Sequence, residues 1–393
     1  MLTNLSLSRA LTVLVGLLLV VSGPVQAQDV PHLRTYFYVG GSYIVDGSGE
    51  HYLRQQMYVE KLVPSAGVTQ PYPIVFIHGW LQSATNFLDK PDGGRGWASL
   101  FLKQGYEVYL ADQPMRGRSP WRENDGVVLT LSAESTMRYF TAISSHNLWP
   151  QAALHTQWPG NGSTGDAVFE AFYSSQIQSI ANTTAQQLAG QIAVAQLLDR
   201  IGKPAVLLGH SQGGPIPLLA ADVRPDLVKA IILIEPAGPP FQEITFEDPD
   251  ARPWGVTHAP ITYDPPITSD PRVELLRESF PAEGSKDRLG CILQATNDTS
   301  RPPRELVNLV DKPILLVTGE ASYAAGYDYC TVKYLQQAGC SLASHLELAG
   351  VGIHGNGHMM FLEMNSDIIQ AVIAEWTLAV RSDEAEDNGI IAS

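Results

Sequence analysis

The sequence predicts an α/β fold: a mostly parallel, doubly wound sheet with helices on both faces and an antiparallel hairpin at its N-terminal end. Short apolar runs of strand length recur along the chain, and residues 184–201, with helix-like apolar spacing, stand directly before the run at 205–208. No internal repeat is visible. Because α/β folds often reach 393 residues as one unit, we expect residues 28–393 to form a single domain with insertions.

The first 27 residues have the pattern of a secretory signal peptide. Arg9 supplies the positive charge, residues 11–21 form an apolar core too short to span a bilayer, and Val25-Gln26-Ala27 is a small-residue cleavage site. An uncleaved anchor is the alternative. We expect a secreted protein, extracellular or, in a bacterium, periplasmic. Since no later stretch approaches transmembrane length, we expect no stable membrane insertion.

The net charge argues against two classes of partner. The chain has 25 Lys and Arg against 40 Asp and Glu, a formal charge of −15. Arg9 is the one charged side chain in residues 1–27, so without them the charge is 24 − 40 = −16. Such a charge disfavours binding to nucleic acid and to anionic membrane surfaces. The oligomeric state is not indicated by the sequence.

Eight stretches are expected to form the strands of the sheet. In chain order they are residues 35–44, 55–63, 73–77, 106–111, 205–208, 228–234, 313–318 and 344–349. The first two flank Asp46-Gly47-Ser48-Gly49, a turn-rich break that favours a hairpin. Most of the others are short, continuous apolar runs, which are typical of buried strands.

Two long segments interrupt this pattern. Residues 118–180 are irregular, and a loop of this length is usually a lid or binding loop. Residues 237–312 are rich in proline, so we expect a cap that adds no strand to the sheet. The terminal helix is expected at 367–380, before an acidic, solvated tail at 383–387.

The segment Gly209-His210-Ser211-Gln212-Gly213 matches the pattern G-x-S-x-G of a nucleophile elbow. In that motif a strained turn between a strand and a helix lifts a serine hydroxyl above the sheet. The flanking glycines are needed because a Cβ would collide with a neighbouring strand or helix. The pattern alone is weak, but a buried strand before it and a helix after it supply the required context. Pro217 fits that helix if it lies in the first turn.

A serine nucleophile needs a histidine base, which follows it in the chain of such enzymes. The downstream histidines are His258, His345, His354 and His358. Only the last two lie in a loop after the final expected strand. We favour His358, whose loop is packed down by the apolar residues that follow; His354 is more typical of a structural histidine.

The carboxylate that orients the base has three candidates at strand ends, Glu235, Glu320 and Asp328. In the common arrangement the acid follows the strand that ends near residue 318, which would select Glu320 or Asp328. The residues themselves leave this choice open.

A set of motifs spread over most of the mature chain resembles a branch of secreted or periplasmic α/β-hydrolase esterases. The motifs are His78-Gly79-Trp80, Pro91-Asp92-Gly93-Gly94-Arg95-Gly96-Trp97, Asp112-Gln113 with Arg116-Gly117-Arg118-Ser119, residues 209–213, Ile234-Glu235-Pro236 and residues 354–360. The resemblance implies the α/β-hydrolase fold and a catalytic glutamate after the sixth strand. It therefore implies Glu235 as the acid.

The oxyanion hole is expected to use the backbone N–H of Gln212, next after the nucleophile, and that of Trp80. The Trp80 side chain is then free to shape the acyl pocket or to serve packing alone. The chain lacks the His-Gly-Gly-Gly form of many lipases, which disfavours esters of bulky tertiary alcohols. No cofactor is expected, and the cysteine spacing disfavours a zinc site.

Export allows the three cysteines to form one disulfide. We favour Cys291 with Cys330, which would fasten the second insertion to the core, and leave Cys340 as a free thiol. Three sequons, at Asn161, Asn182 and Asn297, are acceptor sites for glycosylation in a eukaryotic host.

Together these patterns predict a secreted serine carboxylic-ester hydrolase that acts on a small-molecule ester through an acyl-enzyme. A lactonase, thioesterase or peptidase would use the same residues, and a catalytically silent binding protein is the alternative of another class. Epoxide hydrolases and dehalogenases are disfavoured because they need an aspartate in place of Ser211.

Overall fold

The computed structural model describes residues 29–246, 251–297 and 302–390. Its main sheet has eight strands in the order β1-β2-β4-β3-β7-β8-β11-β12. The strands are β1 (His32–Val45), β2 (His51–Pro64), β3 (Ile74–Ile77), β4 (Val108–Asp112), β7 (Ala205–His210), β8 (Val228–Ile234), β11 (Ile314–Thr318) and β12 (Ala343–Glu347). From β4 to β12 all neighbouring strands are parallel, whereas β1, β2 and β4 pair antiparallel. The predicted fold class is confirmed.

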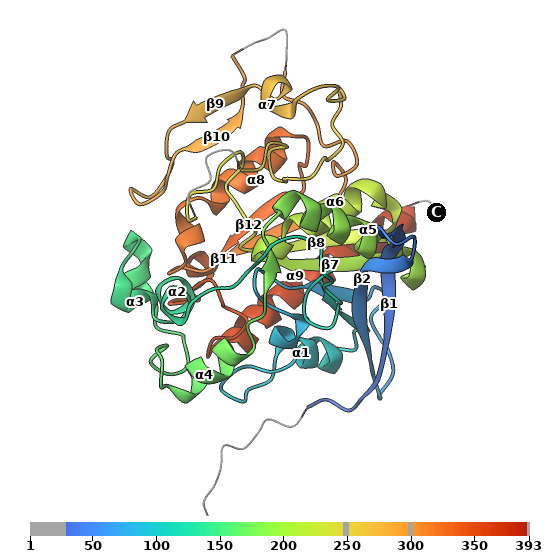
Figure 1. Cartoon of the computed structure of the whole chain (residues 1–393). Helices are drawn as coiled ribbons and strands as arrows, with labels where there is room; N and C mark the ends of the chain where they lie inside the picture. The colour runs from blue at the N-terminus through green and yellow to red at the C-terminus, as the bar shows by residue number, and fades with distance from the viewer. Residues whose placement is uncertain (1–28, 247–250, 298–301, 391–393) are drawn as a thin grey trace, which may run out of the picture.

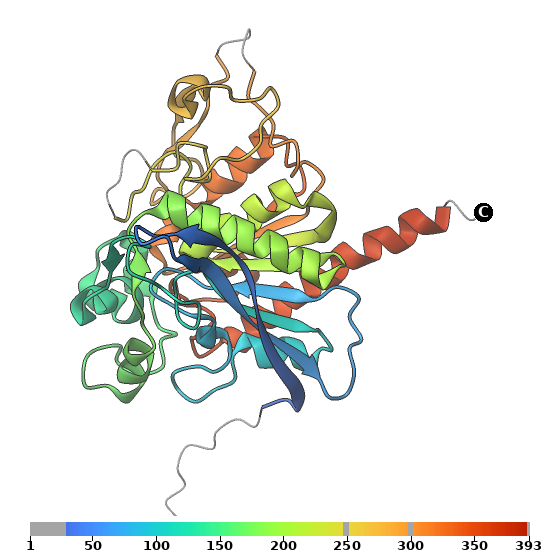
Figure 2. The same cartoon turned by 45° about the vertical axis from the view of Figure 1, so that its right-hand side comes forward.

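Helices cover both faces of the sheet (Figures 1 and 2). On one face lie α5 (Thr183–Ile201), α6 (Pro215–Val223) and α8 (Asp328–Gln337); on the other lie α1 (Trp97–Lys103) and α9 (Ser366–Ile390). Alternate residues of one strand supply the two cores: in β7, Leu207 faces the α5 side and Leu208 the α1 side. Because both faces are covered, the central strands are apolar throughout, which is why they were recognisable in the sequence.

The N-terminal hairpin is longer than expected. β1 and β2 pair from His32 with Pro64 to Val45 with His51, beyond the limits that the sequence pattern indicated. The turn between them lies where predicted, and the Asp46 carboxylate accepts hydrogen bonds from the amides of Ser48 and Glu50 at 2.8 and 3.0 Å. β2 then joins the hairpin to β4 and so to the parallel strands.

The first insertion is built from short elements. It contains β5 (Val128–Leu129), α2 (Ala133–Thr136), a π-helical turn (Met137–Thr141), α3 (Ile143–His146), a 3₁₀ turn (Pro150–Leu154), α4 (Ala167–Ser174) and β6 (Ser179–Ile180). β5 and β6 pair with each other, outside the main sheet.

The second insertion adds no strand to the main sheet, but it has a small sheet of its own that the sequence analysis did not predict. After α7 (Pro271–Glu274), β9 (Arg277–Phe280) pairs antiparallel with β10 (Cys291–Gln294). Buried side chains of this insertion join the core on the α8 side of the main sheet. The insertion lies above α8 in Figure 1.

Cys291 in β10 is disulfide-bonded to Cys330 in α8, and Cys340 is a buried free thiol, as predicted. The acidic stretch at 383–387 was expected to be a tail, but α9 continues through it to Ile390. Pro217 is the third residue of α6, inside the first turn, where an N–H has no partner within the helix.

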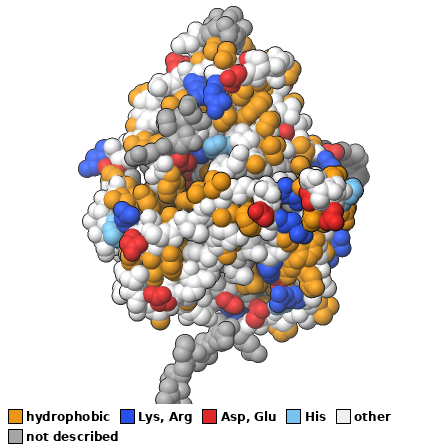
Figure 3. Space-filling model, in the orientation of Figure 1, with side chains coloured by type: hydrophobic (Ala, Val, Ile, Leu, Met, Phe, Trp, Pro, Cys, Tyr) orange, Lys and Arg blue, Asp and Glu red, His pale blue; other side chains and the backbone are white. Residues whose placement is uncertain are grey.

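The predicted signal peptide lies outside the described residues. Across 29–246, 251–297 and 302–390, no helix combines the length and the apolar character that crossing a bilayer requires. Asn161, Asn182 and Asn297 are all exposed, and their glycosylation stays a prediction. On the face shown in Figure 3, Lys and Arg side chains occur in small groups mixed with Asp and Glu, without a broad basic field.

Candidate active site

The segment 209–213 forms a tight turn between β7 and α6 with the backbone strain that the motif requires. Ser211 has φ +52°, in the left-handed region that side chains rarely adopt. A Cβ on Gly209 would lie 2.7 Å from the Gly213 carbonyl oxygen, and one on Gly213 would lie 2.3 Å from that of His78. Only glycine fits these two positions, so the glycines allow the turn that presents Ser211.

His358 and Glu235 lie in direct contact, although 123 residues separate them. The distance between His358 Nδ1 and Glu235 Oε2 is 2.6 Å. Glu235 directly follows β8, the sixth strand of the main sheet in chain order, and has φ +42°. Its carboxylate also accepts hydrogen bonds from the Gly319 amide at 2.7 Å and the Ser322 hydroxyl at 2.5 Å. The His358 imidazole is thus held by a group that is itself held by two donors.

Burial governs the charges of this pair, since both side chains are almost inaccessible. Loss of water lowers the pKa of His358, so its resting form is the neutral imidazole. Loss of water also raises the pKa of the Glu235 carboxyl, and the hydrogen bonds from Ser322 and Gly319 oppose that shift. With Nδ1 bound to Glu235, Nε2 is the ring nitrogen of His358 left to accept a proton.

The other candidates lie elsewhere. His354 is 62 % exposed and pairs with Glu320, at 3.0 Å between Nδ1 and Oε1. Asp328 is buried and accepts a hydrogen bond from the Thr318 hydroxyl at 2.8 Å. The strands bring none of these three to Ser211: none of them lines the pocket described next.

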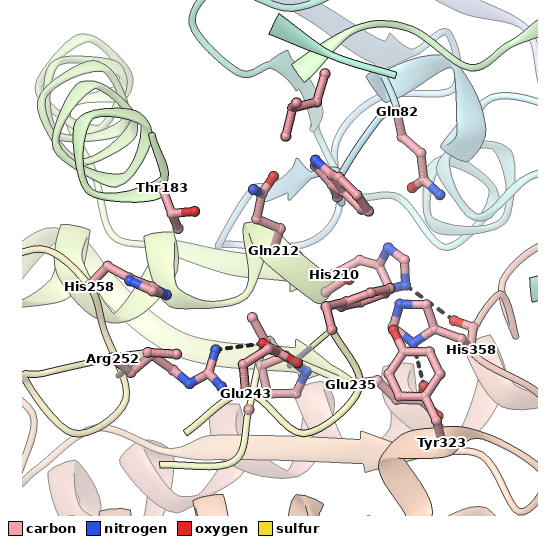
Figure 4. A pocket seen from close by; sticks show the side chains of 18 of the residues that line it. Gln82, Thr183, His210, Gln212, Glu235, Glu243, Arg252, His258, Tyr323 and His358 are labelled. Atoms are coloured by element: carbon pink, nitrogen blue, oxygen red, sulfur yellow. Dashed lines mark hydrogen bonds and ion pairs between the residues drawn. The ribbon is translucent and has the colours of Figure 1, made fainter. Parts of the chain in front are cut away.

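A pocket of about 350 Å³ collects the five residues that the sequence singled out. They are Ser211, His358, Glu235, Trp80 and Gln212. Figure 4 shows His358, Glu235 and Tyr323 at one end and Glu243, Arg252 and His258 at the other. Leu129 and Phe140 come from the first insertion and Phe246 from the second, so both insertions build its walls.

Aromatic rings surround the imidazole, and sequence reasoning did not find them. The ring centroid of His358 lies 4.6 Å from that of Tyr323 and 5.6 Å from that of Phe140. Phe246 lies 5.6 Å from Trp80 and 6.3 Å from Tyr323. Tyr323 lines the same pocket as Ser211. The position of Tyr323 just past a strand end was the only signal that could have marked it.

Two further residues, also missed in the sequence, hold the loop that carries His358. His210 donates from Nε2 to the His358 carbonyl oxygen at 3.2 Å. Glu363, fully buried, accepts from the Gly357 amide at 3.0 Å and contacts His155 Nε2 at 2.7 Å. The loop that carries His358 is thus fastened on one side to the turn at residues 209–213 and on the other to the first insertion.

The residues that line the pocket do not form a metal-binding cluster. Among the described residues, no three His, Cys, Asp or Glu side chains converge to hold a metal ion.

Comparison with known proteins agrees with this architecture. Residues 72–257 match the family model described as alpha/beta hydrolase fold. The chain is 45% identical over 344 residues to a protein named "Probable secreted lipase phiG" from Fungal sp. (strain ATCC 74256), covering 88% of this chain and 89% of that protein. A structure titled "The Atomic Resolution Structure of a Novel Bacterial Esterase" aligns with a TM-score of 0.58 at 19% identity, over 89% of this chain and 97% of the other. The chain belongs to the α/β-hydrolase fold family.

Proposed function

We propose that this protein hydrolyses carboxylic esters of small molecules through an acyl-enzyme on Ser211, with His358 as general base and Glu235 as the acid that orients it. The observation that carries the proposal is the 2.6 Å contact between His358 and Glu235 inside the pocket that Ser211 also lines. A strained serine, a neutral imidazole and a buried carboxylate are the parts that acyl transfer needs.

In the first half of the reaction, the Ser211 hydroxyl attacks the ester carbonyl and its proton passes to Nε2 of His358. The new C–O bond leaves a tetrahedral oxyanion, which the backbone N–H groups of Trp80 and Gln212 stabilise. Collapse of this intermediate breaks the bond to the leaving alkoxide, which takes the proton from His358. Glu235 stabilises the imidazolium while it exists.

Water completes the cycle by the same route. His358 takes a proton from water as the water oxygen attacks the acyl-enzyme, and the second tetrahedral intermediate collapses to release the carboxylic acid. The proton returns to the Ser211 oxygen, so the enzyme is regenerated without a cofactor.

The pocket supports a small, largely apolar substrate. Its volume of about 350 Å³ lies in the range of small-molecule sites, and its aromatic rings offer apolar contact. The similarity to a protein named a secreted lipase favours an ester over a thioester, lactone or peptide.

Labelling with a fluorophosphonate probe tests the proposal. The intact protein should be labelled and should cleave nitrophenyl esters; Ser211→Ala should lose labelling and lose turnover by at least ~10³-fold. Rates on a panel of esters of graded chain length, lactones, thioesters and peptides then show which of these bonds the protein cleaves best. Absence of labelling in the folded wild type would indicate a binding protein instead.

We also propose that the protein is secreted. The signal pattern of residues 1–27 and the name of the relative support this. The secreted protein should begin at Gln28, which N-terminal sequencing checks; a chain that retains residues 1–27 would contradict the proposal.

A further inference from the structure

The motif that follows β4 was singled out in the sequence, yet no step of the proposed reaction uses it. It contains Arg116, which is completely buried. Its Nη1 donates to the Gly79 carbonyl oxygen at 2.8 Å, and its Nη2 donates to the side-chain oxygen of Gln212. Arg116 therefore bridges the two segments that would supply the oxyanion donors.

The contact with Gly79 controls the direction of the next amide. The Gly79 carbonyl and the Trp80 N–H belong to one planar trans peptide, in which they point in opposite directions. Arg116 and Nδ1 of His78 both donate to that carbonyl, the second at 2.9 Å, and so fix its direction. They thereby direct the Trp80 N–H toward the opposite side of the peptide.

The Gly79 end of this peptide is packed against the elbow that carries Ser211. A Cβ on Gly79 would stand 3.0 Å from Cβ of Ser211 and 2.7 Å from Nδ1 of His210. The peptide is therefore packed directly against the elbow, and a small rotation of its plane would change where the Trp80 N–H points relative to Ser211.

The charge of Arg116 is unusual as well. Within the described part of the chain no carboxylate pairs with its guanidinium, and its Nε has no partner. Asp112, the nearby carboxylate of the same motif, pairs with Arg118 instead. Burial lowers the pKa of Arg116 to about 9, which leaves it protonated at neutral pH. A buried cation without a counterion is costly, and a negative charge developing nearby reduces that cost.

We propose that Arg116 is a positioning residue for the oxyanion hole: it orients the backbone donors of Trp80 and Gln212 through the Gly79 carbonyl and the Gln212 side chain. Its charge also favours the tetrahedral state electrostatically. The inference rests on the proposed function, since it presumes acyl transfer at Ser211.

Substitution of Arg116 with a matched control tests this inference. Arg116→Met should lower kcat for a nitrophenyl ester roughly 10–100-fold with KM little changed, less than the ~10²–10³-fold typical of losing a donor outright. Arg116→Lys keeps the charge but cannot bridge both oxygens, so its kcat should be intermediate. Arg118→Met is the control: it breaks the pairing with Asp112 and Glu60 and should lower stability while kcat per folded molecule is kept.

The decisive readout is the affinity for an alkyl trifluoromethyl ketone, which forms a tetrahedral alkoxide adduct with a serine. Active sites are counted by fluorophosphonate titration, so loss of folded protein is separated from loss of rate. In Arg116→Met, the affinity for this ketone should fall by the same factor as kcat/KM. If Arg116→Met does not fold, the same comparison is made with Arg116→Lys. Unchanged affinity and kcat per titrated site would overturn the inference alone. Retained turnover in Ser211→Ala would overturn the proposed function together with it.

Discussion

At the scale of single residues, two of the three residues proposed to carry the chemistry have a strained backbone. Ser211 and Glu235 both have positive φ, and each directly follows a parallel strand. Such conformations cost on the order of 1–3 kcal/mol each and persist where the surroundings hold them. Here the Ser211 carbonyl accepts from the Ala237 amide at 2.8 Å, and the Glu235 amide donates to Val317 at 3.1 Å. The loops that carry Ser211 and Glu235 are therefore held in place by backbone hydrogen bonds, one of which joins them directly.

The assignment of Glu235 as the acid can be tested by comparison with Glu320, which also pairs with a histidine. Glu235 and His358 are both buried, whereas His354 is 62 % exposed and Glu320 is 22 % exposed. Glu235→Gln should lower kcat by roughly 10³–10⁴-fold, because an amide at this position favours the wrong imidazole tautomer. Glu320→Gln should change kcat by no more than about threefold, because Glu320 does not line the pocket and an amide oxygen can still accept from the Gly355 amide. Steady-state kinetics on both variants, with circular dichroism as a check of folding, decides; the reverse ranking would identify Glu320 as the acid.

The three carboxylates also show why the site could be predicted only in part. Ser211 was recognisable because its glycine spacing falls between a buried strand and a helix, and all three features can be read from the local sequence. Glu235, Glu320 and Asp328 all follow strands, and nothing in the local sequence says which carboxylate faces the imidazole. The choice of Glu235 depended on a resemblance. Tyr323 and Arg116 contact the site across segments that are distant in the sequence, which no local pattern encodes.

At the scale of elements, burial decided which strands were predictable. β8 was predicted with its bounds because both faces are covered and the run is apolar throughout. β9 was not, because Arg277–Phe280 has a single apolar residue and pairs through its backbone with a strand beyond an intervening loop. The extension of α9 was missed because an acidic stretch was read as a solvated tail.

The disulfide is the covalent link between the second insertion and α8, and its removal should weaken the whole chain. Cys291 and Cys330 are 39 residues apart, and closing a loop of this size stabilises a protein by about 2–4 kcal/mol. Replacing both by alanine should lower the free energy of unfolding by that amount, measured by urea denaturation. Cys340→Ala, which keeps the disulfide, is the matched control. An unfolding free energy equal to that of the control would contradict the prediction.

At the scale of the whole molecule, buried titratable groups make stability depend on pH. Burial lowers the pKa of His78 and His345 to about 4, and it also lowers the pKa values of His210 and His358. These histidines are neutral when folded and protonate on unfolding, so stability is lost as pH falls from about 6.5 toward their folded pKa values.

Glu235 and Asp328 act in the opposite direction. Burial raises both pKa values, so their contribution is complete at low pH and is lost as pH rises. Four histidines against three carboxyls, since burial also raises the pKa of Asp89, leave a net loss of stability as pH falls from 6.5 to 4.5. Urea denaturation of Ser211→Ala across this interval measures it. A stability that rises on acidification would show that the carboxyls dominate.

The two insertions reach the pocket in different ways. Phe246 lines the pocket and contacts the rings of Trp80, Tyr139 and Tyr323. His155, in contrast, is joined through Glu363 to the amide of Gly357, next to the imidazole that is proposed to move protons. Natural variation near residue 246 can thus alter which molecules enter while leaving proton transfer intact. Variation near residue 155 would alter selectivity and turnover together. The second insertion can therefore change more readily than the first when a new substrate range evolves.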